Sequence, residues 1–130
     1  MAKTLSAVLF LCGLMAGNSN ASTICKIEDS LIGIKAIAWN DEDGTAKITD
    51  TLNNTLAGRI SLKRKHDGGE KVNIYLKYER PYYGDDAAEY MIFPVGNGQF
   101  RIIGVTYVIR NNEKYLNASS GNFLATCIKL

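Results

Sequence analysis

Residues 72–78 read Val-Asn-Ile-Tyr-Leu-Lys-Tyr, and the alternation within this stretch decides the fold class. Every second side chain from Val72 to Tyr78 is apolar or aromatic, whereas polar Asn73 and Lys77 lie among the residues between them. A period of two is typical of a β-strand with one face on a hydrophobic core and the other face in water. We therefore expect an antiparallel sheet as the basis of this domain.

Further strands are expected on both sides of this one, at residues 31–39, 45–49, 59–63, 89–93, 99–110, 114–116 and 123–128. Gly, Asn and Asp turns separate them at intervals of about 8 to 12 residues, a spacing typical of all-β domains. One of these turns is expected to be a polar hairpin loop at residues 64–70. Residues 50–57 and 85–89 are the only stretches that could be helical. The predicted fold class is all-β, a small antiparallel β-sandwich or barrel of about seven or eight strands.

The longest predicted strand, at residues 99–110, is apolar on both faces. Phe100 and Ile102 lie on one face, and Ile103 and Val105 lie on the other. A strand of this kind is expected to be central in the sheet. Gly104 in its middle is expected to mark a bulge or a sharp bend, which would let the sheet curl.

The amino-terminal residues 1–21 have the composition of a signal peptide. Lys3 precedes an apolar run, and small residues precede an expected cleavage after Ala21. The apolar run is shorter than the roughly 20 residues that a membrane-spanning helix needs. We expect cleavage to leave a single β domain, residues 22–130, that is periplasmic or secreted and has no membrane span.

Two cysteines, Cys25 and Cys127, bracket that domain, while Cys12 lies in the leader. In an oxidising compartment such a pair is expected to form a disulfide bond. The bond would bring the first and last strands together, which favours a closed or nearly closed sheet. Two unpaired buried thiols are the alternative.

The charge of the domain is nearly balanced. The chain carries 15 basic and 13 acidic residues, and removal of Lys3 leaves 14 against 13, a net charge of +1. A nucleic-acid-binding domain would be expected to show a strongly basic surface. We therefore expect no nucleic-acid partner.

The first candidate site is a loop expected at residues 78–86, which combines aromatic side chains with an arginine: Tyr78, Arg80, Tyr82 and Tyr83. Tyr and Arg are enriched among the residues that carry binding energy at interfaces, and tyrosine rings can also stack on sugars. We expect this loop to bind another exported protein or a glycan, with Tyr82 and Tyr83 exposed. The alternative is that the rings only cover the end of the barrel.

The second candidate site is a basic hairpin tip, formed by Lys63, Arg64, Lys65 and His66. Clustered positive charge could bind a phosphate, an anionic polysaccharide or an acidic protein surface. Asp67 and Glu70 lie close behind, so a solvated and largely neutralised turn is the alternative.

The sequence predicts no metal site and no cofactor. Three acidic residues precede Gly44, but the distal glutamate of an EF-hand loop is missing. His66 is the one histidine of the chain, and no recognised catalytic motif accompanies it. A small secreted hydrolase that uses the carboxylates Asp85, Asp86 and Glu89 remains the alternative to a binding function.

Residues 119–123 read Ser-Ser-Gly-Asn-Phe. At up to three positions they resemble the Ser-Gly-x-x-Tyr loop that periplasmic lysozyme inhibitors insert into a lysozyme cleft. Phe123 departs from that pattern, because it comes one place early and lacks the hydroxyl. The resemblance implies inhibition of a cell-wall hydrolase as one form that binding could take. We expect a non-enzymatic exported domain that acts by binding.

Overall fold

The computed structural model describes residues 22–28, 33–66 and 69–130. The expected signal peptide lies outside these residues. The described chain forms nine strands: β1 (Ser22–Ile27), β2 (Ile34–Asn40), β3 (Thr45–Asp50), β4 (Thr55–His66), β5 (Gly69–Tyr82), β6 (Asp85–Gly96), β7 (Gln99–Arg110), β8 (Glu113–Ser119) and β9 (Phe123–Lys129).

The strands close into an antiparallel barrel. Strands β1 to β7 pair in chain order, and β9 lies between β7 and β1, so that eight strands complete the ring. Strand β8 pairs with β7 and stands outside the ring as an extra strand. The structure therefore decides between the two predicted architectures in favour of a barrel.

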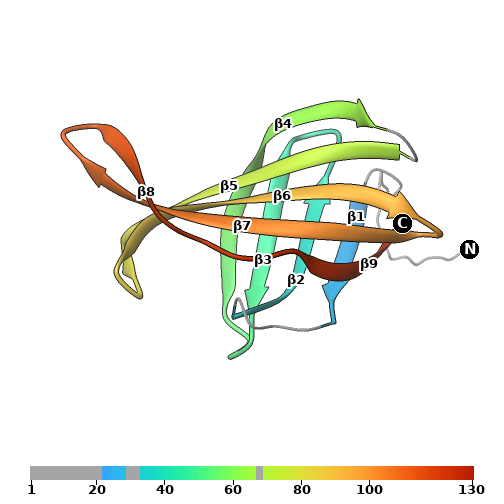
Figure 1. Ribbon diagram of the computed structural model, residues 1–130, viewed down its shortest axis with the longest axis horizontal. Coiled ribbons are helices and arrows are strands. Elements are labelled where there is room, and N and C mark those ends of the chain that lie inside the picture. Colours follow the sequence, from blue (N-terminus) through green and yellow to red (C-terminus); the bar gives the residue numbers. More distant parts are fainter. Residues whose placement is uncertain (1–21, 29–32, 67–68) are drawn as a thin grey trace, which may run out of the picture.

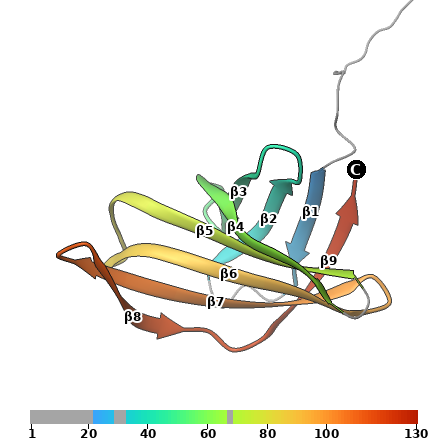
Figure 2. The same ribbon diagram turned by 90° about the horizontal axis from the view of Figure 1, so that it is seen from above.

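The barrel is flattened into two layers whose strands cross steeply, as Figure 1 shows. Strands β1, β2 and β3 form one layer, and β5, β6 and β7 form the other. Strand β4 bends from the first layer into the second, and its pairing with β5 shifts in register between Ile60 and Leu62. Corners of this type are where crossed sheets commonly use a bulge. Figure 2 shows the same layers from above.

Inward-facing side chains fill the barrel, as expected for a ring of eight strands. The fully buried side chains include a set of branched aliphatic residues from both layers: Ile37, Ile48, Val72, Ile74, Leu76, Ile92 and Ile102. Val72, Ile74 and Leu76 are members of this set, so the alternation in residues 72–78 identified the core face correctly.

The first and last strands are neighbours, as the cysteine pattern predicted. Cys25 of β1 lies directly opposite Cys127 of β9, and the two form a disulfide bond that spans 102 residues of sequence. Cys25 is completely buried. The bond therefore closes the barrel at the seam between the chain ends.

Several predicted boundaries were wrong because the strands are longer than the alternation suggested. Strand β4 continues to His66 and β5 resumes at Gly69, so the expected hairpin loop at residues 64–70 is mostly strand. Neither of the two stretches that could have been helical forms a helix. Residues 50–57 hold the end of β3, a turn and the start of β4, and residues 85–89 form the start of β6.

Gly104 does not mark a bulge between β6 and β7. It pairs with Tyr90 in an unbroken register, and a Cβ atom at Gly104 would lie 3.0 Å from the Tyr90 ring. The glycine is needed for this close approach of ring and backbone. It also lies where the partner of β7 changes from β9, up to Ile102, to β8, from Val105.

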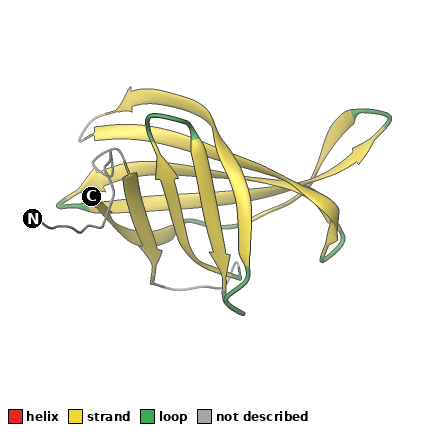
Figure 3. Cartoon of the chain, turned by 180° about the vertical axis from the view of Figure 1, so that it is seen from behind, coloured by secondary structure: helices red, strands yellow, loops and turns green. Residues whose placement is uncertain are grey.

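The barrel has two unlike ends. Both described chain ends, the β2–β3 and β6–β7 connections, the end of β4 and the start of β5 lie at one of them, which we call the terminal end (Figure 1). The β3–β4 turn and the β5–β6 and β7–β8 hairpins lie at the other, the tyrosine end. Figure 3 shows these two hairpins projecting beyond the ring of strands.

Candidate functional site

The tip of the β5–β6 hairpin is a two-residue turn instead of the longer loop that the sequence suggested. Tyr82 pairs with Asp85, which leaves Tyr83 and Gly84 as the connection. Their φ angles are +51° and +86°. Positive φ at both central residues is the requirement of a type I′ turn. Glycine meets it freely, whereas a residue with a Cβ atom is strained there by about 1 to 2 kcal/mol.

Two other hairpins of this chain show what the turn ordinarily uses. Asn97 and Gly98 connect β6 to β7 with φ angles of +56° and +72°, and Asn111 and Asn112 connect β7 to β8 with φ angles of +51° and +65°. Asparagine tolerates this conformation better than most residues. The β5–β6 hairpin alone among these three places a tyrosine at the first position.

A buried carboxylate anchors this hairpin to the barrel. Asp50, at the end of β3, is 2% exposed. Its side chain accepts a hydrogen bond of 2.6 Å from the Tyr82 hydroxyl, and backbone hydrogen bonds of 2.9 and 2.7 Å from Leu52 and Asn54 in the β3–β4 turn. The hydrogen bond from Tyr82 is the largest cause that lowers the pKa of Asp50 from 3.8 to about 2.

The three tyrosines of the candidate loop form a row of contacting rings. Tyr78 and Tyr82 stack with their centroids 4.9 Å apart, and Tyr83 meets Tyr82 edge-on at 4.6 Å. Tyr78 and Tyr82 are half-buried, and Tyr78 packs against the core. Tyr83 is 79% exposed. The expectation of exposure is therefore right for Tyr83 and wrong for Tyr82, because the Tyr82 hydroxyl reaches inward to Asp50.

Arg80, the fourth residue of this candidate site, lies in an irregular part of β5. The register between β5 and β6 shifts between Lys77 and Tyr82, so residues 78–81 leave the ladder there. Arg80 and Pro81 are both exposed. Across the described chain no ion pair involves Arg80, which leaves its guanidinium available to a ligand at the edge of the hairpin.

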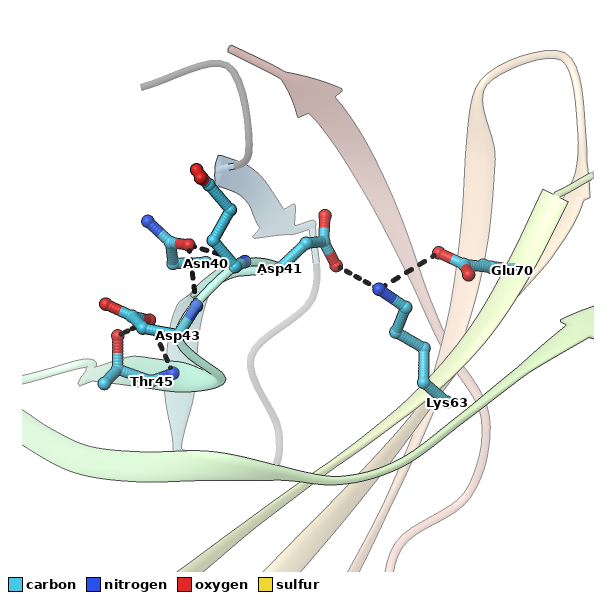
Figure 4. Close-up of polar contacts among 7 residues, drawn as sticks. Asn40, Asp41, Asp43, Thr45, Lys63 and Glu70 are labelled. Atoms are coloured by element: carbon cyan, nitrogen blue, oxygen red, sulfur yellow. Dashed lines mark hydrogen bonds and ion pairs between the residues drawn. The ribbon is translucent and has the colours of Figure 1, made fainter. Parts of the chain in front are cut away.

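The basic residues lie at the terminal end, away from the tyrosines. Lys63 is held between two carboxylates, at 3.2 Å from Asp41 and 4.0 Å from Glu70 (Figure 4). Arg64 and Lys65 are exposed. His66 ends β4, and its side chain lies outside what the structure describes. The predicted basic tip is thus partly neutralised, and it does not join the tyrosine site.

The acidic turn at residues 40–44 is closed on itself, as Figure 4 shows. The Asn40 side chain accepts backbone hydrogen bonds from Glu42 and Asp43, at 2.8 and 3.3 Å. Asp43 accepts two more from Thr45, whose backbone hydrogen bond is the largest cause that lowers the Asp43 pKa. The acidic side chains therefore shape the turn, and the described residues contain no cluster of metal ligands.

The three carboxylates of the alternative hydrolase are bound by different partners. Asp85 accepts a 2.7 Å hydrogen bond from Asn117. Asp86 accepts one of 2.8 Å from the Ile109 backbone. Glu89 lies on the outer face of β6, where it accepts hydrogen bonds from Ser61, Asn73 and Tyr107. Each carboxylate thus holds strands or hairpins together.

The segment that resembles an inhibitor loop runs along β7. Gly104 donates a 2.8 Å hydrogen bond to the Ser120 hydroxyl, and the Ser120 amide donates one of 2.8 Å to the Gly104 carbonyl. Phe123 packs against the core, while Gly121 and Asn122 are exposed. In this protein the segment links β8 to β9.

Sequence reasoning missed Asp50 as the residue that positions the site. The signal was present, because Asp50 and Asn54 bracket a polar turn, and Asp side chains commonly accept hydrogen bonds from the following backbone. The long-range partner, Tyr82, could not be read from the sequence. Tyr90 and Thr106, which lie behind the hairpin, were hidden within predicted strands.

Compared with protein-family models, with curated proteins and with solved structures, the chain matches none of them. Among the residues that the structure describes, no helix has the length and apolar character needed to cross a membrane.

Proposed function

We propose that this protein is an exported binding domain, periplasmic or secreted, that captures a partner protein with the tip of its β5–β6 hairpin. The observation that carries the proposal is Tyr83, which is 79% exposed in a strained backbone conformation. Strained residues cluster where function requires them. The export part of the proposal is supported by the leader sequence and by the disulfide bond.

The tip of the β5–β6 hairpin is suited to binding because contacts with the barrel hold it in place. Asp50 fixes Tyr82, and Tyr82 orients the ring of Tyr83 through an edge contact. An aromatic anchor held in place before binding loses little conformational entropy when the complex forms. The β3–β4 turn, which Asp50 ties to the hairpin, also exposes Leu52. Leu52 can therefore add apolar contact beside the aromatic anchor.

A projecting tip fits a partner with a concave surface. The proposed partner is an exported protein that has an apolar pocket or cleft deep enough to enclose the Tyr83 ring. A cell-wall hydrolase belongs to this class, and occupation of its cleft would inhibit it. Inhibition is thus one form of the proposed function.

The proposal is tested by capture on the immobilised, disulfide-bonded protein from a periplasmic extract and from culture medium of the native organism. Tyr83→Ala removes the anchor, and Tyr115→Ala is the matched control, since Tyr115 is 52% exposed on the other projecting hairpin. We expect a protein that is retained by the wild type and by Tyr115→Ala but lost by Tyr83→Ala. Equal retention by all three, or retention by none, would contradict the proposal.

A further inference from the structure

Two adjoining cavities lie at the mouth of the barrel, at the tyrosine end behind the projecting hairpin, and together we call them the mouth groove. Its first half has a volume of about 320 Å³ and is lined by the aromatic row, Tyr78, Tyr82 and Tyr83, and by Asp85. Its second half has a volume of about 330 Å³ and is lined by Ser119, Ser120 and Phe123. The two halves adjoin at Tyr90 and Thr106, which line both. Barrel mouths are frequent ligand sites.

An unpartnered polar atom lies where the halves meet. The Thr106 hydroxyl oxygen is buried and has no hydrogen-bond partner within the described chain. A buried hydroxyl without a partner costs about 1 to 3 kcal/mol, so such atoms are uncommon unless something else satisfies them. A turn of the Thr106 side chain about χ1 would bring this hydroxyl to the groove, where a ligand hydroxyl would supply the missing partner.

Tyr90 adds a second polar group at the same place. Its ring packs on Gly104, close to the backbone of β7. Burial is the largest cause that raises the pKa of Tyr90 to about 12, so the hydroxyl keeps its proton and can donate it. Where the two halves of the groove meet, the Thr106 oxygen can accept a hydrogen bond and the Tyr90 hydroxyl can donate one.

The charged residues that line the groove and the backbone hydrogen bonds beside it limit the chemical class of ligand that it can bind. The lining residues of the two halves that the structure describes include no Lys or Arg, and Asp85 is their charged member. Anionic ligands are therefore disfavoured. The Gly104 amide and carbonyl are both bonded to Ser120, so an extended peptide cannot pair with β7 there. A neutral ligand that is rich in hydroxyls and has apolar faces to stack on aromatic rings fits this lining.

We infer that the mouth groove binds a neutral oligosaccharide of at least two rings, with Thr106 and Tyr90 hydrogen-bonded to its hydroxyls at the junction. The rings of Tyr78, Tyr82 and Phe123 stack on its apolar faces, and Asp85 accepts hydrogen bonds from hydroxyls in the first half. This site uses the inward side of the hairpin and does not depend on capture of a protein by Tyr83.

The test is a nuclear magnetic resonance titration of the disulfide-bonded protein with cellobiose and with N,N′-diacetylchitobiose. We expect at least one of them to cause saturable shifts in the amide signals of Gly104, Ser119 and Ser120. A sulfated disaccharide at the same concentration should leave these signals unchanged. If neither neutral disaccharide causes saturable shifts, or if the sulfated one binds as well, the inference is overturned.

Two variants separate recognition from folding. Thr106→Val keeps the side-chain shape and removes the unpartnered hydroxyl, so it should weaken saccharide binding at least tenfold while the unfolding midpoint stays the same or rises. Tyr90→Phe removes the donor and should also weaken binding, and Tyr115→Ala should bind like the wild type. Wild-type affinity in both Thr106→Val and Tyr90→Phe would overturn the assignment.

Discussion

At the scale of single residues, Tyr83 and Asp50 have opposite effects on the stability of the same hairpin. Tyr83 holds a positive φ angle that asparagine or glycine would adopt at lower cost. Asp50 offsets this strain, because its carboxylate ties the hairpin to the β3–β4 turn through Tyr82 and Asn54. The hairpin is thus strained at its tip and firmly held at its base.

The strain can be measured by exchanging residues between equivalent turn positions. Tyr83→Asn should raise the free energy of unfolding by about 1 kcal/mol, because asparagine tolerates positive φ. The reciprocal change in the β7–β8 hairpin, Asn111→Tyr, should lower it by a similar amount. Denaturant titration measures both. A lower free energy of unfolding in Tyr83→Asn would show that the contacts of the tyrosine ring outweigh the strain of its backbone.

Asp50 predicts how stability depends on pH. Its pKa of about 2 in the folded protein lies below the ordinary value of 3.8, so the charged form stabilises the fold. That contribution is fully present above about pH 4 and is lost as the pH falls through about 2. We expect Asp50→Asn to be less stable than the wild type at pH 7, with the difference closing toward pH 2.

Chemical denaturation at pH 7, pH 4 and pH 2 measures this difference. Tyr82→Phe is the matched control, since it keeps the ring and removes the hydroxyl that bonds Asp50. It should move the carboxyl titration of Asp50, followed by nuclear magnetic resonance, to higher pH. A gap between wild type and Asp50→Asn that is independent of pH would contradict the assigned role.

At the scale of strands, the alternation in β5 makes a prediction with an internal control. Ile74 is completely buried, whereas Lys77 of the same strand is exposed. Ile74→Thr should lower the free energy of unfolding by about 2 to 3 kcal/mol, because it removes buried apolar volume and buries a hydroxyl. Lys77→Thr places the same β-branched residue on the outer face and should change stability by less than about 0.5 kcal/mol. Equal effects would mean that the register is wrong.

The strands also show which features can be predicted from sequence alone. Local alternation located the core of β5, and the span of β7 was predicted correctly, because both properties depend on side chains within one strand. Strand ends were less predictable, since β4 and β6 are lengthened by backbone pairing with the next strand, β5 and β7, and this pairing does not depend on the alternation of side chains. Gly104 was expected to mark a bulge or a sharp bend, because the Tyr90 ring, which approaches it closely, belongs to another strand.

The candidate site shows the same difference between features that local sequence sets and features that depend on contacts between distant residues. The residue types of the tyrosine hairpin were visible in the sequence, and so was their location between two strands. The burial of Tyr82 could not be predicted, because it depends on a hydrogen bond to Asp50, which is 32 residues away in the chain. The mouth groove could not be predicted either, because it is assembled from strands that closure of the barrel brings together.

At the scale of the whole molecule, the disulfide bond joins β1 to β9 across a separation of 102 residues. A crosslink that closes so long a loop stabilises mainly by restricting the unfolded chain. Cys25→Ala should therefore lower the free energy of unfolding by about 2 to 5 kcal/mol. Denaturant titration of the variant checks this value, and the wild type in a reducing agent should show a comparable loss. An unchanged midpoint in both would mean that the bond does not support the barrel seam.

The closed barrel is also what gives the tyrosine hairpin a fixed direction, since its base is held by β3, β4 and β7 while its tip projects (Figure 3). The most direct measurement is the affinity of the captured partner for the wild type and for Tyr83→Asn. We predict that Tyr83→Asn weakens this affinity about thirtyfold, or about 2 kcal/mol, although the variant is the more stable protein. Equal affinity for the two proteins would contradict the role of Tyr83 as the binding anchor.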